Sequence, residues 1–206
     1  MSDTAESRRE QLVEVFREAR DCTRCGLSES RTQVVFGAGN SDADLMLIGE
    51  APGAEEDRQG LPFVGRSGAL LTRLLEEAGL SREQVFIANT LKCRPPENRD
   101  PTMEEVETCR PWLFEQVRLI EPKVVATLGN FATRLLSGDQ TGITKVRGVP
   151  QVRRLGERTV WLYPLFHPAA ALRATGTAEL LRQDIAALPE LLARDAPTAN
   201  AAGGPG

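Results

Sequence analysis

The chain has 206 residues, of which 41% are hydrophobic and 26% charged, and its formal net charge is −4. This length fits one well-buried core, and the composition is ordinary for a soluble globular protein, enzyme or binding module alike. The negative charge argues against a protein that coats nucleic acid electrostatically. The first ten residues lack the apolar stretch of a signal peptide, and no apolar run is long enough to span a bilayer, so we expect a cytoplasmic protein without membrane contact.

Hydrophobic periodicity and helix-capping signals predict strands that alternate with helices. In chain order we expect an amphipathic helix over 8–20, a buried strand over 45–49, a helix over 70–78, a strand over 85–90, a capped helix over 102–120, a strand over 123–129, a helix N-capped by Asn130, a strand over 160–166, and a last helix from about 177 bent at Pro189.

This alternation predicts an α/β fold, a three-layer α/β/α sandwich around a mostly parallel sheet. We expect a single domain over 1–194 and a disordered tail over 195–206, because the tail is mostly Ala, Gly and Pro and has little to bury. Ligands of such sheets bind beyond the carboxyl ends of the strands. Glu50, Asn89 and His167, the only histidine, each lie at such an end and are predicted to converge on one pocket.

The four cysteines form two groups, Cys22 and Cys25 in a Cys-x-x-Cys pair and Cys93 with Cys109 in mid-chain. In a reducing compartment this spacing favours metal ligands over disulfides, which remain the minority alternative. Zinc and an iron–sulfur cluster both stay open, although the wide separation of Cys93 and Cys109 fits a [4Fe-4S] cluster somewhat better. Alternatively, Cys109 is an ordinary buried thiol.

Other motifs have plain structural explanations when each is taken alone. The Gly49–Gly53 loop lacks the Gly-Lys-Ser/Thr sequence of a phosphate-binding loop, and its carboxylates would repel a phosphate. Carboxylates at 55–57 suit the first turn of a helix, a lone histidine is usually structural, and Phe63 fits a core position. Residues 143–182 carry seven basic and two acidic side chains, an excess of five that suits either phosphates or solvent.

Taken together, these motifs resemble the family 4 uracil-DNA glycosylases, and the resemblance covers about residues 10 to 190. The segments that carry it are Cys22-x-x-Cys25, Gly49-Glu-Ala-Pro-Gly-Ala-Glu-Glu-Asp57, Gly60-Leu-Pro-Phe-Val-Gly-Arg-Ser-Gly68, Asn89-Thr-Leu-Lys-Cys93, Cys109-Arg-Pro-Trp-Leu113 and His167-Pro-Ala-Ala170. It implies a hydrolase that cleaves the N-glycosidic bond of deoxyuridine in DNA, which begins base excision repair. It also implies the glycosylase α/β/α fold and a [4Fe-4S] cluster on Cys22, Cys25, Cys93 and Cys109.

The resemblance further implies how the base is bound. Asn89 pairs with uracil O4 and N3–H, Phe63 stacks on the ring, and His167 donates to O2 as negative charge develops there. Backbone N–H groups of the Gly49–Glu50 loop assist. Glu56 lies near uracil C5, where it helps to exclude the methyl group of thymine.

Glu50 positions water or stabilises the cationic sugar, again by resemblance. The target base must leave the helix, so Leu172 is expected to act as the wedge that fills the gap, and basic residues such as Arg153 and Arg154 are expected to grip phosphates. The expected partner is uracil-containing DNA, single- or double-stranded, bound by a monomer. Covalent trapping is not expected, because no histidine lies between Asn89 and Cys93.

Two other classes of function compete with this hypothesis. A non-catalytic iron–sulfur or zinc module that recognises damaged DNA explains the cysteines but not Glu50, Asn89 and His167 at three strand ends. A redox sensor explains the same constellation still less well.

Overall fold

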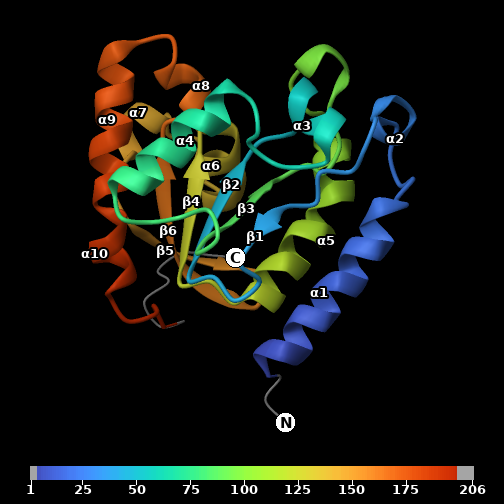
Figure 1. Cartoon of the computed structure of the whole chain (residues 1–206), viewed down its shortest axis with the longest axis horizontal. Helices are drawn as coiled ribbons and strands as arrows, with labels where there is room; N and C mark the ends of the chain where they lie inside the picture. The colour runs from blue at the N-terminus through green and yellow to red at the C-terminus, as the bar shows by residue number, and fades with distance from the viewer. Residues whose placement is uncertain (1–3, 199–206) are drawn as a thin grey trace.

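The computed structural model describes residues 4–198, which fold as a mixed six-stranded sheet between two layers of helices (Figure 1). The order across the sheet is β1-β3-β2-β4-β6-β5, in which the four inner strands are parallel and both edge strands are antiparallel to their neighbours. The strands are β1 (Ala38–Gly39), β2 (Leu45–Gly49), β3 (Phe86–Asn89), β4 (Val124–Leu128), β5 (Gln151–Leu155) and β6 (Arg158–Leu165).

The helices divide between the two faces of this sheet. They are α1 (Ala5–Arg20), α2 (Leu27–Ser30), α3 (Ala54–Gln59), α4 (Arg66–Glu77), the 3₁₀ turn η1 (Pro96–Asn98), α5 (Met103–Ile120), α6 (Asn130–Ser137), α7 (Ile143–Val146), α8 (Pro168–Ala171), α9 (Thr175–Ala186) and α10 (Leu188–Leu192). Helices α1, α5 and α6 share a core with one face, and α4, α8, α9 and α10 share a core with the other. The predicted α/β/α sandwich is thereby confirmed.

The central strands are mostly apolar because both of their faces are covered. Along β2, Met46 and Ile48 contribute to the core under α1 and α5, whereas Leu45 and Leu47 contribute to the core under α4 and α9. All five residues of β2 and of β4 are buried. Each large aliphatic side chain buried in this way stabilises the fold by about 1.5–3 kcal/mol, so these strands hold the sheet edge on which the site is built.

Helix α5 begins where the capping box was predicted. The Thr102 hydroxyl accepts the Glu105 N–H at 3.2 Å, and the Glu105 carboxylate accepts the Thr102 N–H at 2.8 Å. Arg99 pairs with the same carboxylate, and this pairing lowers the pKa of Glu105. The fixed start of α5 sets the position of Cys109 two turns later.

Two strands were missed from the sequence. Strand β1 has only two residues, and β5 is an edge strand whose side chains are mostly half-exposed, so neither carries an apolar run. The N-cap of α6 was also wrong. Gly129 caps that helix with φ of 94°, while Asn130 is its first residue and accepts the Ile143 N–H through its side chain.

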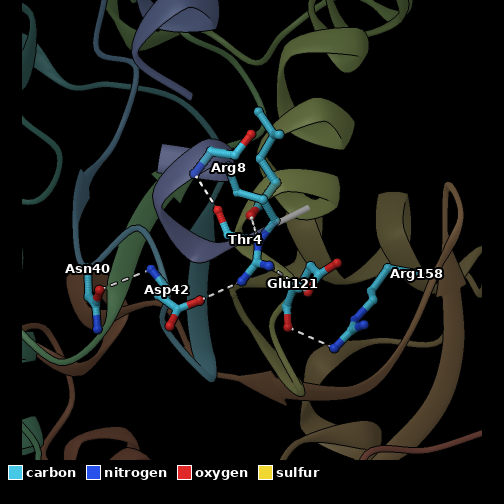
Figure 2. A network of polar contacts seen from close by, with 8 residues as sticks. Thr4, Arg8, Asn40, Asp42, Glu121 and Arg158 are labelled. Carbon is cyan, nitrogen blue, oxygen red and sulfur yellow. Dashed lines mark hydrogen bonds and ion pairs between the residues drawn. The ribbon is translucent and has the colours of Figure 1, made fainter. Parts of the chain in front are cut away.

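A polar network joins α1, α5 and the turn before β2 at the amino ends of the strands (Figure 2). Arg8 donates to the Leu119 carbonyl at 3.0 Å and pairs with Asp42 at 2.7 Å. Arg158 donates to the Glu121 carbonyl at 2.8 Å. The network anchors the start of α1, and the far end of α1 leads into Cys22.

Two further features concern the ends and surface of the described chain. Trp161 donates through its indole N–H to the carbonyl of Asp195, at the point where the tail was expected to begin; residues 199–206 of that tail lie outside the described residues. Among residues 4–198, no helix has the length and apolar character needed to cross a bilayer.

Candidate active site

Three parallel strands deliver the predicted site residues to one edge of the sheet. Gly49 and Asn89 lie side by side in register at the ends of β2 and β3. His167 follows the end of β6 by two residues. Strand β4 lies between β2 and β6 and continues into Gly129. The sheet order therefore brings Asn89, Glu50 and His167 to the same edge, as expected from their positions after strands.

Two glycines leave the space that these side chains occupy. A Cβ at position 49 would lie 2.4 Å from Asn89 Oδ1 and 2.8 Å from Phe63 Cζ, closer than nonbonded atoms come. A Cβ at position 129 would lie 3.1 Å from the His167 Cβ, on a backbone with φ of 94°. Gly49 thus leaves the space in which the Asn89 and Phe63 side chains lie, and Gly129 lets His167 lie over the end of β4.

Phe63 has an unusual backbone conformation that its neighbours hold in place. Its φ is 51°, a region that side chains other than glycine rarely adopt. Arg82 donates to the carbonyls of Phe63 and Pro62 at 2.9 and 2.8 Å. The ring is 6% exposed, and its centroid lies 5.7 Å from that of His167. A strained, fixed aromatic ring beside a pocket is typical of a ligand platform.

Glu56 supports the other side of the Phe63 loop. Its Oε1 accepts the backbone N–H groups of Val64 and Gly65, each at 3.1 Å. The carboxylate is therefore engaged in holding the loop, a role that the sequence did not indicate. The neighbouring Asp57 is buried and accepts the Thr32 N–H, which attaches helix α3 to the segment that follows α2.

The Asn89 side chain is buried yet unpaired. It is 2% exposed, and no hydrogen bond joins its carboxamide to any other residue within 4–198. Within 4–198 the only fully buried side-chain polar atom without a partner is Gln151 Oε1, so the Asn89 amide atoms keep some access to solvent. Asn89 is therefore poised for a ligand that offers one acceptor and one donor, side by side.

The protonation of His167 follows from its contacts. Its Nδ1 accepts the Ala169 N–H at 3.1 Å and caps α8, so the proton of the neutral ring lies on Nε2. Burial lowers the pKa of His167, and the nearby Glu56 carboxylate opposes this effect. The imidazole is thus neutral at physiological pH and presents an Nε2–H donor.

Glu50 faces a cavity of about 540 Å³ beside the pocket. Its lining includes His167, Asp100, Asn130 and Arg134. Burial raises the pKa of Glu50, and the Asp100 carboxylate raises it further. The sequence did not indicate Asp100 or Arg134 as neighbours of Glu50, because they come from a loop and a helix far along the chain.

Leu172 lies at the end of α8, the short helix that His167 caps. Its side chain is 43% exposed, and Arg173 beside it is also exposed. The structure thus places an exposed apolar side chain five residues from His167, where a wedge was expected.

The predicted basic region is mostly engaged in contacts within the protein. Arg153 and Arg154 pair across β5 with Val160 and Thr159, near the start of β6 and far from its carboxyl end. Both donate to backbone carbonyls, and Arg147 is paired with Asp184. Any phosphate contacts of Arg153 and Arg154 would therefore lie away from the site edge, because the β5–β6 hairpin places both residues near the start of β6.

The four cysteines line one small cavity, and all are free thiols. Cys22 and Cys25 come from the segment after α1, Cys93 from the loop after β3, and Cys109 from α5. Cys22 and Cys109, which are 87 residues apart in sequence, therefore lie at the same cavity. Among residues 4–198, no group of three or more Cys, His, Asp or Glu side chains has the geometry of a single metal-ion site.

Hydrogen-bond donors and cations surround the sulfur atoms. Arg31 donates to Cys93 Sγ at 3.4 Å, and the Lys92 backbone N–H donates to Cys109 Sγ at 3.3 Å. Burial raises the pKa of Cys93 to about 11 and also raises that of Cys109. Burial lowers the pKa of Lys92 to about 8. The donor set, four sulfurs with N–H donors and cations beside them, fits a thiolate-bound cofactor of negative charge.

Comparison with known proteins identifies the family. Residues 36–189 match the family model described as the uracil DNA glycosylase superfamily. The chain belongs to this superfamily. It is 48% identical to the type-4 uracil-DNA glycosylase of Thermotoga maritima over 80% of this chain and 85% of that protein. It is 42% identical to the type-4 enzymes of Archaeoglobus fulgidus (92% and 97% covered) and Sulfurisphaera tokodaii (87% and 84%).

These relatives confirm the resemblance to the family 4 glycosylases. Within this glycosylase fold, the structure brings together Gly49, Glu50, Phe63, Asn89 and His167 at one sheet edge. The cysteines line a separate cavity that shares no lining residue with the Glu50 cavity. The roles of these residues toward DNA remain predictions.

The glycosylase pocket depends on the missing side chain at position 49. Gly49→Ala would push Asn89 and Phe63 apart, and a misplacement near 1 Å costs about 100-fold in rate. We expect the single-turnover rate on a uracil oligonucleotide to fall by about that factor. Gly176→Ala in α9 is the matched control, since its Cβ meets nothing within 4 Å; equal rates for the two variants would contradict this account of the pocket.

The raised pKa of Glu50 predicts a pH-dependent stability. The folded state holds the Glu50 proton more tightly than the unfolded state, so its contribution falls as pH rises through the raised pKa. Glu50→Gln removes this cost, and its Tm should exceed that of the wild type at neutral pH. The gap should close as pH falls toward the unfolded carboxyl pKa of about 4.3. Scanning fluorimetry from pH 4 to 8 measures this difference in Tm, with the exposed Glu29→Gln as control. A Tm difference that does not depend on pH would contradict the prediction.

Proposed function

We propose that this chain hydrolyses the N-glycosidic bond between uracil and deoxyribose in DNA, the first step of base excision repair. The observation that carries the proposal is the unpaired carboxamide of Asn89 beside the Phe63 ring and the His167 donor, around the bare backbone of Gly49. These groups suit one flat, polar ring. Family membership and the type-4 relatives support the same activity.

Asn89 is the group that selects uracil. Its Nδ2–H donates to uracil O4 and its Oδ1 accepts from N3–H. Cytosine presents an amino donor at position 4 and no proton on N3, so both contacts become mismatched in a buried pocket. Such mismatches reject an analogue far more strongly than a difference in shape does.

His167 acts on the charge that appears as the bond breaks. The leaving uracil becomes an anion, and the Nε2–H of the neutral imidazole donates to its O2 atom. Because this contact strengthens as charge develops, it lowers the barrier rather than only binding the base. The Gly49–Glu50 backbone N–H groups assist at the same edge.

Glu50 acts on the sugar side of the scissile bond. A carboxylate at the rim of the cavity stabilises the oxocarbenium ion or orients the water that attacks it. Glu56 places the Phe63 ring through its contacts with Val64 and Gly65, in addition to its expected position near uracil C5. Phe63 then supplies the stacking face for the base.

DNA enters with the target base flipped out, and Leu172 fills the space that the base leaves. For the phosphate contacts we propose three exposed arginines around the pocket in place of Arg153 and Arg154. These are Arg66 after the Phe63 loop, Arg134 in the Glu50 cavity and Arg173 beside Leu172. Within residues 4–198 none of the three has an ion-pair partner.

Cys22, Cys25, Cys93 and Cys109 are proposed to hold a [4Fe-4S] cluster. When bound, such a cluster supplies a rigid cross-link among the segments that carry its ligands. The Arg31 guanidinium and the Lys92 backbone N–H donate to the Cys93 and Cys109 sulfurs and oppose the rise in thiol pKa that burial causes. The cluster is proposed to be structural, since the bond-breaking groups lie on other residues.

The assay that tests the function uses a DNA oligonucleotide with one uracil, treated with alkali after incubation to reveal abasic sites. His167→Ala should slow single-turnover cleavage by about 100- to 1,000-fold, the cost of losing one donor to a developing anion, while binding to uracil DNA stays nearly intact. Equal loss of binding and rate would argue against the assigned role. An intact oligonucleotide with wild-type protein would instead favour the non-catalytic binding module.

Asn89→Asp tests base selection in the same assay. The change replaces the donor to O4 with an acceptor, so uracil excision should fall by about ten-fold to a few hundred-fold. The preference for uracil over cytosine should narrow, because the cytosine amino group donates to the new carboxylate. An unchanged ratio of the two rates would show that another residue reads the base.

The cluster proposal is tested by metal analysis. Protein purified aerobically should be brown, with broad visible absorbance and about four irons per chain. Because the cluster is proposed to be structural, Cys109→Ser should lower the Tm, while the rate of uracil cleavage by the molecules that remain folded should change little. Stoichiometric zinc without iron would refute the assignment, since the sequence contains only these four cysteines.

A further inference from the structure

Lys92 is a buried cation between the base pocket and the cysteine site. Its side chain is among the largest that are fully buried, and the residue is 2% exposed. Its Nζ donates to the carbonyl of Asn89 at 2.8 Å and to Gln116 Oε1 at 2.6 Å. A buried ammonium is costly unless it is hydrogen-bonded, so these two acceptors account for its presence.

Gln116 is itself held in one orientation. It is fully buried in α5, and its Nε2 donates to the Phe36 carbonyl at 2.8 Å. The Phe36 ring also lies 5.8 Å from the Lys92 ammonium, within range of a cation–π contact. The direction of Gln116 Oε1 is therefore fixed, and with it the position of the Lys92 ammonium.

The same lysine is tied to the cysteine site through its backbone. Its N–H donates to Cys109 Sγ, and Cys93 is the next residue. The ammonium thus reaches back to the end of β3, while the backbone N–H of the same residue contacts the Cys109 sulfur. Lys92 thus links the Cys109 sulfur, through its backbone, to the Asn89 carbonyl, through its side chain.

We propose that Lys92 is a positioning residue for uracil recognition, which holds the Asn89 backbone so that the carboxamide meets the base, and which couples this geometry to the cysteine site. The inference rests on the proposed function, and it concerns a residue that does not touch the base. Lys92 contacts the backbone carbonyl of Asn89 and not its side chain. It therefore acts on the carboxamide indirectly, by fixing the backbone from which that side chain extends over Gly49.

Lys92→Met tests the inference because methionine matches the length of the stem and removes the donors. We expect the single-turnover rate of uracil cleavage, per iron-loaded molecule, to fall by about 10- to 100-fold. Binding to a duplex with cleavage-resistant 2′-fluoro-deoxyuridine should lose its advantage over undamaged duplex. Affinity for the undamaged duplex itself should stay unchanged, because phosphate contacts supply it. Lys123→Met, at the start of β4 with an exposed ion pair to Asp44, is the matched control.

A lysine with only a structural role would give a different result. Lys92→Met would then lower the Tm, while below the Tm the preference for the fluorinated uracil duplex and the rate per iron-loaded molecule would match the wild type; that outcome overturns the inference. Loss of iron in step with loss of rate overturns it as well. If wild-type protein leaves uracil in place, the proposed function fails, and the inference with it.

Gln116→Glu provides a second test of the role of Lys92 if Lys92→Met does not fold. The substitution preserves size, removes the donor to the Phe36 carbonyl and draws the ammonium toward a carboxylate, away from the Asn89 carbonyl. We expect a smaller fall in rate, about three- to ten-fold, with iron content and visible absorbance retained. A wild-type rate in this folded variant overturns the inference.

Discussion

The pairing of β2 with β3 beyond their formal ends is the constraint on which the site depends. The Thr90 N–H donates to the Gly49 carbonyl at 2.9 Å, and the Leu91 N–H donates to the Glu50 carbonyl at 3.0 Å. The Thr90 hydroxyl donates to the same Glu50 carbonyl. Because two parallel strands leave the sheet in register, their loops continue side by side, and the Glu50 carboxylate after β2 and the Asn89 carboxamide at the end of β3 lie at the same edge.

The site depends on two glycines that lack side chains and on a strained backbone conformation that neighbouring residues stabilise. Gly49 and Gly129 leave room for Asn89, Phe63 and His167, and the Phe63 backbone adopts a sparsely populated conformation. Such a residue costs about 1–3 kcal/mol and persists only where neighbours hold it. Arg82 and Glu56 supply these contacts from both sides of the loop. Rigidity at the base platform is thus achieved at the expense of local stability, as in many binding sites.

Most of the fold followed from local patterns. The strands that are covered on both faces, such as β2 and β4, are predicted by their continuous apolar runs. Helix α5 is predicted by its capping box. The two antiparallel edge strands were not predicted. Strand β1 has only two residues and β5 is half-exposed, so neither contains an apolar run that could be detected. Asn130 was taken for a cap because side-chain propensity is local, whereas the cap position is occupied by Gly129, whose positive φ of 94° favours glycine.

For the site, the sequence by itself determined which chemical groups stand at strand ends and that four cysteines belong together, because both are properties of position along the chain. Only the tertiary structure decided which groups support them. Lys92 and Gln116 are 24 residues apart, and Arg82 and Phe63 are 19 apart, yet each pair is in direct contact. The proton on Nε2 of His167 likewise follows from a contact in space. Such pairings have no period in the sequence; they exist because packing brings distant segments together, and burial then favours a partner for most polar groups.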